Sequence, residues 1–434
     1  MVDYAYVKVW GQLVGVVRWI PERNLALFQY DKSFLSKNWD LSPIKMPISN
    51  GDRVYSFPEL LKEKDSANDT FNGLPGLLAD SLPDKYGNKL IDQWLAQNGR
   101  PIGSMNPVEK LCFIGSRGMG ALEFEPAQLK EGKNTFAIEI SGLVDIAKKM
   151  LSKRETFEAN FNKDEQRAMK EILKIGTSAG GARPKALVAY NKKTGEIRSG
   201  QTKAPQGFEH WLLKLDGVSG VQFGESHGWG RVEYAYYLMA KECQIEMMDS
   251  ELLEENGRAH FITKRFDREG NEIKHHIQTL CGIQHFEYSD MFAYSYEQVF
   301  QTMRQLKLKY PEAEQMFRRM VFNVFATNYD DHTKNFAFRL KKDGNWELAP
   351  AYDLCYSYDP TNHWVSKQTL SVNGKREDIT QSDLMAIAKA NNIKKGERII
   401  NEINIVVKKW GDFASKTNVR DDIREQIEST HNTI

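Results

Sequence analysis

A dense polar segment at residues 328–336, with the sequence Asn-Tyr-Asp-Asp-His-Thr-Lys-Asn-Phe, places the strongest limit on how this chain folds. The apolar residues 316–326 precede it, and their large side chains recur at the spacing of a buried helix. The alternating residues 336–340 follow it and predict a strand. A polar loop held between a buried helix and a strand is rigid, which catalysis requires and a solvated linker does not.

Three side chains in and after this loop have the order that protein kinases use. Asp330 and Asn335 are five residues apart, and Asp353 follows 18 residues after Asn335. In kinases, an Asp orients or deprotonates the attacking hydroxyl, an Asn five residues later binds a metal, and a second Asp after a short hairpin also binds metal. Mg2+ prefers such oxygen ligands. The alternative is a surface turn, which Asn and Asp also favour.

Length and composition limit the class of protein. The chain has 434 residues, enough for two or three domains, and its 27% charged and 41% hydrophobic residues are ordinary for a globular protein. The formal net charge of +1 gives no overall basic field for nucleic acid. The four cysteines are scattered and fit neither a zinc site nor a disulfide framework, which indicates a reducing compartment. Because no apolar run approaches the roughly 18 residues of a membrane span, we expect a cytoplasmic protein with no membrane partner.

The N-terminal part favours strands and ends in a glycine-rich turn. Residues 4–10, 13–19 and 25–30 alternate in the manner of strands. The glycine-rich residues 115–120 precede the short strand 121–124. Phosphate-binding glycine turns usually lead into a helix, so a structural turn is favoured here over a phosphate site.

A second glycine-rich stretch, residues 176–185, leads into the predicted strand 186–190. Kinases cover the nucleotide phosphates with a flexible glycine loop, because glycines let backbone amides approach phosphate closely. An ordinary flexible loop remains the alternative.

A lysine and a glutamate downstream suggest an ion pair. Lys214 lies among apolar residues in the predicted strand 210–215, and Glu233 lies on the predicted helix 232–243. A lysine in such a strand is costly to bury unless it is paired, and kinases pair a strand lysine with a helix glutamate to position phosphates. Alternatively, Lys214 points to solvent from an edge strand. Residues 265–268 follow another strand and are a candidate hinge between lobes.

The rest of the chain is mainly helical. We predict helices at residues 296–306, 312–328, 381–390, 395–410 and 412–430. Basic residues concentrate near the first two of these helices: Arg304, Lys307, Lys309, Arg318 and Arg319. We interpret this group as a solvated face and not as a binding patch.

Taken together in this order, the motifs resemble those of the HipA family of bacterial toxin kinases. The matching segments are residues 82–84, 114–116, 176–185, 265–268, 330–335 and 350–353. The resemblance covers nearly the whole chain. It implies an α+β, two-lobed protein-kinase-like fold with an N-terminal β-rich subdomain and a helical C-terminal lobe. The implied domains are an N-terminal subdomain at residues 1–135, a kinase N-lobe with the glycine loop at 136–268, and a helical C-lobe at 269–434.

The resemblance also implies roles for individual residues. Asp330 is implied as the catalytic Asp, Lys214, His332 and Lys334 as further catalytic residues, and Asn335 and Asp353 as ligands of Mg2+. Contacts with ATP are implied for Ser178, Ala179, Gly180, Gly181, Lys185, Lys214, Glu233, Lys264 and Phe266. Ser178 is the matching position for autophosphorylation, with Thr177 beside it as the second candidate.

The implied function is that of a toxin–antitoxin serine/threonine kinase. Relatives phosphorylate serine on proteins, with aminoacyl-tRNA synthetases as targets. Their partners are helix-turn-helix, HipB-like antitoxins, through which they meet operator DNA. Two alternatives stay open, a small-molecule phosphotransferase and an inactive kinase fold that acts as corepressor of its antitoxin.

Overall fold

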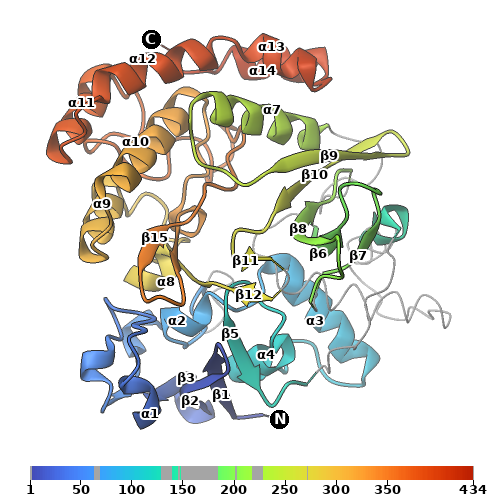
Figure 1. The fold of residues 1–434 in the computed structure, drawn as a ribbon, viewed down its shortest axis with the longest axis vertical. Helices are drawn as coiled ribbons and strands as arrows, with labels where there is room; N and C mark the ends of the chain where they lie inside the picture. The colour runs from blue at the N-terminus through green and yellow to red at the C-terminus, as the bar shows by residue number, and fades with distance from the viewer. Residues whose placement is uncertain are drawn as a thin grey trace. The chain divides into compact units, whose positions relative to one another are not determined.

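The computed structural model describes residues 2–62, 69–128, 139–144, 147, 184–200, 203–217, 228–270 and 272–433 (Figure 1). The chain forms two compact units. Unit 1 contains Met1–Ser42, Met46–His227 and Glu251–Ile277, and unit 2 contains Pro43–Lys45, Gly228–Ser250 and Gln278–Ile434. The predicted division at residues 135 and 268 stays a prediction.

Unit 1 begins with a five-stranded antiparallel sheet in the order β4-β3-β2-β1-β5. Its strands are β1 (Tyr4–Val9), β2 (Gln12–Ile20), β3 (Leu25–Tyr30), β4 (Val54–Tyr55) and β5 (Leu122–Glu125). Alternation along β1 buries Ala5, Val7 and Val9 and exposes Tyr4 and Tyr6, as a one-sided sheet requires. The three strands predicted near the N-terminus are confirmed.

Helices also occur in this part of the chain, and the first and last of those described here pack against this sheet. These helices are α1 (Lys32–Leu35), α2 (Gly76–Ala79), α3 (Lys85–Gln97) and α4 (Pro107–Ile114). The last two begin where capping side chains occur, because Asp84 accepts a hydrogen bond from the amide of Gly87 and Asn106 accepts one from the amide of Glu109. Pro107 at the first position of α4 lacks the N–H that would otherwise be unsatisfied there.

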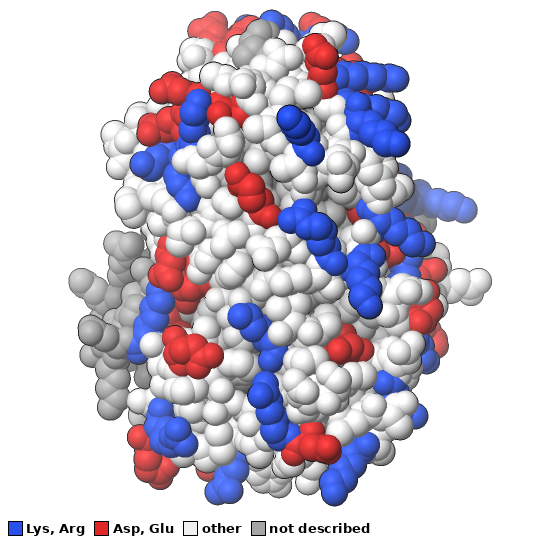
Figure 2. Space-filling model, turned by 90° about the vertical axis from the view of Figure 1, so that its left-hand side faces the viewer, with Lys and Arg blue, Asp and Glu red and all other residues white. Residues whose placement is uncertain are grey.

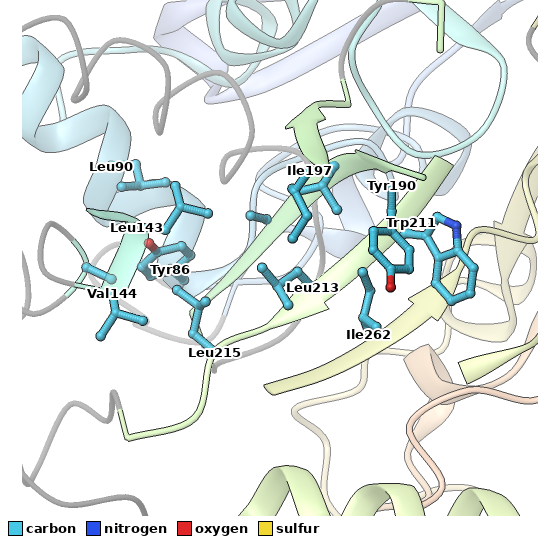
Figure 3. Packing of buried hydrophobic residues seen from close by; sticks show 13 residues of the cluster. Tyr86, Leu90, Leu143, Val144, Tyr190, Ile197, Trp211, Leu213, Leu215 and Ile262 are labelled. Atoms are coloured by element: carbon cyan, nitrogen blue, oxygen red, sulfur yellow. The ribbon is translucent and has the colours of Figure 1, made fainter. Parts of the chain in front are cut away.

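The second sheet of unit 1 has the order β7-β6-β8-β10-β9. Its strands are β6 (Lys185–Tyr190), β7 (Ile197–Ser199), β8 (Glu209–Lys214), β9 (Ser250–Glu255) and β10 (Arg258–Lys264). Figure 3 shows the core on one face of this sheet, where Trp211, Leu213 and Ile262 pack with Tyr86 and Leu90 of α3. Burial of these large side chains is what fixes the central strands β6, β8 and β10. The small strands β11 (Arg268–Glu269) and β12 (Ile273–Lys274) follow as a two-stranded ribbon.

Unit 2 is mainly helical. Its helices are α7 (Trp229–Glu242), α8 (Leu280–Gln284), α9 (Tyr296–Gln305), α10 (Tyr310–Phe325), α11 (Gln381–Ala390), α12 (Gly396–Val407), α13 (Trp410–Lys416) and α14 (Asp421–Glu428). Helix α10 packs against α9 and α12, and α7 packs against α12 and α13. The predicted helices at 395–410 and 412–430 are divided differently, since α12 ends at Val407 and a separate short helix, α13, begins at Trp410.

A three-stranded sheet, in the order β13-β14-β15, accompanies these helices. Its strands are β13 (His276–Thr279), β14 (Ala337–Leu340) and β15 (Trp346–Leu348). The predicted α+β class, with a β-rich N-terminal part and a helical C-terminal part, is confirmed. No helix among the described residues is long and apolar enough to cross a bilayer. Lys and Arg are interspersed with Asp and Glu over the face drawn in Figure 2, so that face carries no field of a single sign.

Candidate active site

The hairpin β14–β15 brings the segments that carry Asn335 and Asp353 to the same end, although the two residues are 18 positions apart. Phe338 pairs with Leu348, and the amide of Ala349 donates a 3.0 Å hydrogen bond to the carbonyl of Ala337. The chain entering β14 and the chain leaving β15 therefore lie at the same end of the hairpin. The hydroxyl of Tyr352 donates a 2.6 Å hydrogen bond to the carbonyl of Lys334 and ties the two segments together.

The polar loop ends in one turn of 3-10 helix, Thr333–Asn335, which the sequence did not predict. His332 caps this turn, because its Nδ1 accepts a 3.2 Å hydrogen bond from the amide of Lys334. That bond assigns the proton of the neutral ring to Nε2, which lies 3.7 Å from Oδ1 of Asp330. The distance is too long for a hydrogen bond between these two side chains.

The side chain of Asp330 is 45% exposed, which leaves its carboxylate accessible to an acceptor molecule. Asn335 braces the main chain of the same residue, since its Nδ2 donates a 2.6 Å hydrogen bond to the carbonyl of Asp330. With the amide nitrogen used in this way, Oδ1 of Asn335 is the atom of the side chain suited to a cation. The structure thus brings Asp330, His332 and Asn335 together in the loop that ends in this turn.

Asp353 has a left-handed backbone, with φ of +53°. This conformation is uncommon outside glycine, although Asp and Asn tolerate it better than other residues, and it persists where neighbours fix the chain. Upstream, Arg319 donates a 2.8 Å hydrogen bond to the carbonyl of Ala349, and the amide of Ala351 donates one of 2.8 Å to Glu246. Hydrogen bonds with Arg319 and Glu246 therefore fix the segment that leads to Asp353.

Lys334 is placed by an aromatic ring that the sequence gave no reason to select. Its Nζ lies 4.7 Å from the ring centre of Tyr288, within the range of a cation–π interaction. The same ring lies 5.3 Å from that of His332. Tyr288 therefore supports both basic side chains of the loop.

Asp331 differs from its neighbour Asp330 in being buried, with only 1% of its surface exposed. It accepts hydrogen bonds from Tyr296, Gln368, Thr369 and Leu370. Burial raises the pKa of this carboxyl to about 7, although the four donors act in the opposite direction. No sequence pattern singled it out, because its partners lie at least 35 residues away along the chain.

The residues Asn335 and Asp353 suit a magnesium ion in the company of a nucleotide. Mg2+ in kinases is held by one or two protein oxygens and completes its shell with phosphate oxygens and water. An amide oxygen and one carboxylate are such a donor set. Among the described residues there is no cluster of three or more His, Cys, Asp or Glu side chains that would hold a metal without such a ligand.

The predicted nucleotide-binding lysines lie in unit 1. Lys214 lies on β8, which is an inner strand between β6 and β10, so the alternative of an edge strand is wrong. Lys185 is its register partner on β6, and Nζ of Lys214 lies 5.7 Å from the ring centre of Phe261. These two cations are neighbours on one face of the sheet.

The other residues that we predicted to contact ATP lie at different places along the chain. Lys264 forms an ion pair with Glu209, and Phe266 follows β10 in a half-buried position. Glu233 is buried on α7 in unit 2, whereas Lys214 belongs to unit 1, so their ion pair stays a prediction. The positions of the glycine loop, Thr177, Ser178, Ala179, Gly180 and Gly181, lie outside the described residues.

The first glycine-rich turn, residues 115–120, is bound within unit 1 by an ion cluster. Asp267 accepts a 2.7 Å hydrogen bond from the amide of Gly120, and Arg265 and Arg268 both donate to the carbonyl of Gly118. Although burial alone would raise it, the two arginines hold the pKa of Asp267 well below its usual range. These contacts support the structural turn that we favoured from the sequence.

Comparisons with known proteins agree with this layout. Residues 5–125 match the model of the HipA N-terminal domain, and residues 177–410 match that of the HipA-like C-terminal domain. A chain of the Shewanella oneidensis MR-1 toxin–antitoxin complex of HipA, HipB and operator DNA superposes with a TM-score of 0.65 and 16% identity, over 98% of this chain and 94% of that one. The likeness confirms the predicted kinase-like α+β fold.

Two further proteins match a smaller part of this chain than the Shewanella protein does. A putative kinase of Haemophilus influenzae is 27% identical over 135 residues, which are 28% of this chain and 39% of that protein. The match thus spans about two fifths of that relative's length. The Helicobacter pylori proinflammatory kinase CtkA superposes over 51% of this chain and 92% of its own, with a TM-score of 0.30 and 12% identity.

Proposed function

Because the chain belongs to the HipA family, we propose that it is an ATP-dependent protein kinase that phosphorylates serine or threonine hydroxyls. The observation that supports this proposal is the bond from Tyr352 to Lys334, which joins the segments of Asp353 and Asn335, together with the exposed Asp330 that Asn335 braces. Phosphoryl transfer requires little more of a protein than such positioning and electrostatic stabilisation.

Each residue of the site has a task in this chemistry. Asp330 orients the acceptor hydroxyl and accepts its proton. Asn335 and Asp353 hold magnesium, which when bound neutralises charge on the nucleotide phosphates. His332 and Lys334 offer positive charge or N–H donors at the loop, and Lys214 and Lys185, on the second sheet of unit 1, are proposed to contact the nucleotide phosphates. The remaining contacts with ATP are proposed for Ser178, Ala179, Gly180, Gly181, Glu233, Lys264 and Phe266.

The family also suggests the biological setting. HipA of Shewanella oneidensis was solved with HipB and operator DNA, and we propose an analogous helix-turn-helix antitoxin for this chain. Contact with operator DNA would occur mainly through that antitoxin. The proposed target is a protein serine, with an aminoacyl-tRNA synthetase as the first substrate to test, and the proposed site of autophosphorylation is Ser178 or Thr177.

The decisive experiment measures transfer of labelled phosphate from ATP to the chain itself and to a general protein acceptor such as casein. The wild type should transfer phosphate in the presence of Mg2+ and stop when EDTA removes the metal. A chain that binds ATP but phosphorylates only small molecules would support the phosphotransferase alternative. A chain that neither binds nor turns over ATP would support the inactive corepressor instead.

A growth experiment tests the toxin role separately. Expression of the wild-type chain without an antitoxin should arrest growth, whereas the Asp330→Asn variant should not. Equal arrest by both forms would point to a toxin that acts by binding and not by catalysis.

A further inference from the structure

Asp330 and Asp331 are consecutive residues with opposite environments. The side chain of Asp330 is 45% exposed, whereas Asp331 is 1% exposed. A buried carboxyl group is costly unless hydrogen bonds compensate for the lost water. The hydrogen bonds around Asp331 therefore indicate why a buried carboxyl group lies at this position.

Each oxygen of Asp331 accepts two hydrogen bonds. Oδ1 accepts from the main-chain amides of Thr369 at 2.9 Å and Leu370 at 3.2 Å. Oδ2 accepts from the Tyr296 hydroxyl at 2.7 Å and from Nε2 of Gln368 at 2.6 Å. With both oxygens engaged inside the protein, Asp331 is suited neither to bind metal nor to accept a proton from substrate.

The segment that carries Thr369 also holds the residue on the other side of Asp330. The carbonyl of Tyr329 accepts a 2.7 Å hydrogen bond from the Thr369 hydroxyl and one of 3.2 Å from its amide. Residues 368–370 thus hold the chain both immediately before and immediately after the proposed catalytic residue. We call these contacts the 368–370 clamp.

The clamp is itself fixed to the helices of unit 2. Tyr296 begins α9 and accepts a 2.9 Å hydrogen bond from Asn323 of α10, whose Oδ1 accepts another of 2.9 Å from Asn328. Arg376 donates to the carbonyl of Thr369 and, at 3.0 Å, to that of Tyr294. Any change at Asp331 is therefore transmitted to a connected polar network and not to one isolated contact.

We propose that Asp331 is a positioning residue, whose buried carboxyl, through the 368–370 clamp, fixes the direction in which Asp330 points. The inference rests on the proposed kinase function and adds a residue to its machinery. Misplacing a catalytic group by about 1 Å can lower a rate about 100-fold, so loss of the clamp should lower kcat more than it weakens ATP binding.

Two substitutions at position 331 separate the positioning role from general stability. Asp331→Ala removes the acceptor for all four donors. Asp331→Asn keeps the size and one oxygen for the amides of Thr369 and Leu370. Its new NH2 group can donate to Gln368 after reversal of that amide, because Oε1 of Gln368 has no hydrogen-bond partner among the described residues. We expect Asp331→Asn to retain much of the activity that Asp331→Ala loses.

Asp383 provides a matched control in the same unit. It is a buried carboxylate at the start of α11 that also accepts four hydrogen bonds, from Asn373, Lys375 and the amide and hydroxyl of Thr380. None of these donors lies in residues 328–336 or in the 368–370 clamp. Asp383→Ala should therefore lower the melting temperature without lowering kcat while the protein is folded.

The experiment measures kcat for phosphate transfer to the chain and to casein, ATP affinity, and hydrogen exchange of the Thr369 and Leu370 amides. For Asp331→Ala we expect kcat to fall at least about tenfold, ATP affinity to change less than about threefold, and both amides to exchange faster. Asp331→Asn should stay within about fivefold of the wild type in kcat. Unchanged kcat in folded Asp331→Ala, or an equal loss in Asp383→Ala, would overturn the positioning role.

Tyr296→Phe keeps the proposal testable if Asp331→Ala does not fold. It removes one donor to Asp331 while preserving the buried ring, and kcat should fall several-fold with faster exchange at Leu370. Unchanged kcat would count against the inference. A wild type that transfers no phosphate at all would remove the kinase proposal, whereas hydrogen exchange would still report whether the clamp exists as a purely structural feature.

Discussion

Tyr352 donates a 2.6 Å hydrogen bond to the carbonyl of Lys334, and this contact joins the segment that carries Asp353 to the one that carries Asn335. The two proposed metal ligands lie before β14 and after β15, so their separation depends on how firmly the hairpin end is closed. The contact is thus a test of how the site is assembled.

The substitution Tyr352→Phe removes this hydrogen bond and keeps the ring. We expect a loss of about 1 kcal/mol in the free energy of unfolding and a several-fold weaker affinity for ATP in the presence of Mg2+. Denaturant titration and calorimetric ATP binding measure the two effects. Tyr4→Phe, at a half-exposed position on β1, should change neither quantity. Unaltered ATP affinity in Tyr352→Phe would show that the hairpin end stays closed without the bond.

Asp330→Asn and Asp353→Asn should each abolish phosphate transfer while leaving the protein folded, because the role proposed for each carboxylate depends on its charge. Asn also tolerates the left-handed backbone of position 353, so the substitution changes charge and not conformation. Asp353→Asn should weaken magnesium-dependent ATP binding more than Asp330→Asn does. Asp343→Asn in the turn between β14 and β15 serves as the control, and wild-type transfer by either active-site variant would refute the assignment.

Lys214→Met should lower ATP affinity and the rate of transfer, because the lysine lies on an inner strand beside Lys185 and we propose that it supplies positive charge for phosphate. Circular dichroism and thermal unfolding establish that the effect exceeds any loss of stability. Lys193→Met, in the exposed turn between β6 and β7, removes a lysine without touching that sheet face. Normal ATP turnover by Lys214→Met would make Lys214 a structural residue.

The raised pKa of Asp331 predicts a pH dependence of stability. Burial raises this pKa from the ordinary 3.8 to about 7, so the folded protein holds the proton more tightly than the unfolded chain does. The stabilisation from Asp331 is therefore complete below about pH 4 and is lost as the pH rises through about 7, with a slope of at most about 1.4 kcal/mol per pH unit. The groups that face it, Tyr296, Tyr329 and Arg376, titrate far above this range.

Comparison with Asp331→Asn isolates this effect, because asparagine has no proton to lose. Between pH 5.5 and 8 the variant should gain on the wild type by about 2 kcal/mol in the free energy of unfolding. Denaturant titrations of both proteins at four pH values measure the difference. A difference that stays constant over this range would mean that the four donors outweigh burial and keep Asp331 ionised.

Phosphorylation of Ser178 is a prediction from sequence alone, because residue 178 lies outside the described residues. A phosphate there adds about −1.5 to −2 charge next to the proposed site of the ATP phosphates and should lower ATP affinity by repulsion. Mass spectrometry should find phosphate on the peptide 176–185 of the wild type and none in Asp330→Asn. Phosphate in the variant would instead indicate that another kinase modifies the chain. Modification of Thr177 alone would make Thr177 the acceptor in place of Ser178.

The sequence allowed us to select those candidate site residues that lie close together along the chain. Asp330, Asn335 and Asp353 were selected because one loop and one hairpin carry them, and local spacing expresses such geometry directly. The environment of Asp331 could not be predicted, since Tyr296 and Gln368 lie 35 and 37 residues away in opposite directions.

The environment of Lys214 also could not be predicted, because it depends on strand pairing over a long distance along the chain. The strand looked like a possible edge strand, and only the pairing with β10, some 50 residues later, makes it an inner strand. Where a fold depends on partners distant in sequence, residue type and periodicity specify the element but not its neighbours.

The ion cluster of Arg265, Asp267 and Arg268 has a consequence for modularity. Its hydrogen-bond partners, Gly118 and Gly120, lie about 150 residues earlier, within the segment that matches the N-terminal family domain. Lys274 adds bonds to Ser116 and Glu123 of the same segment. Separate expression of the two family domains would thus remove the bonds of Arg265 and Arg268 to the carbonyls of Gly118 and Gly120. The two family domains are therefore expected to be less stable when expressed apart than when they are joined in one chain.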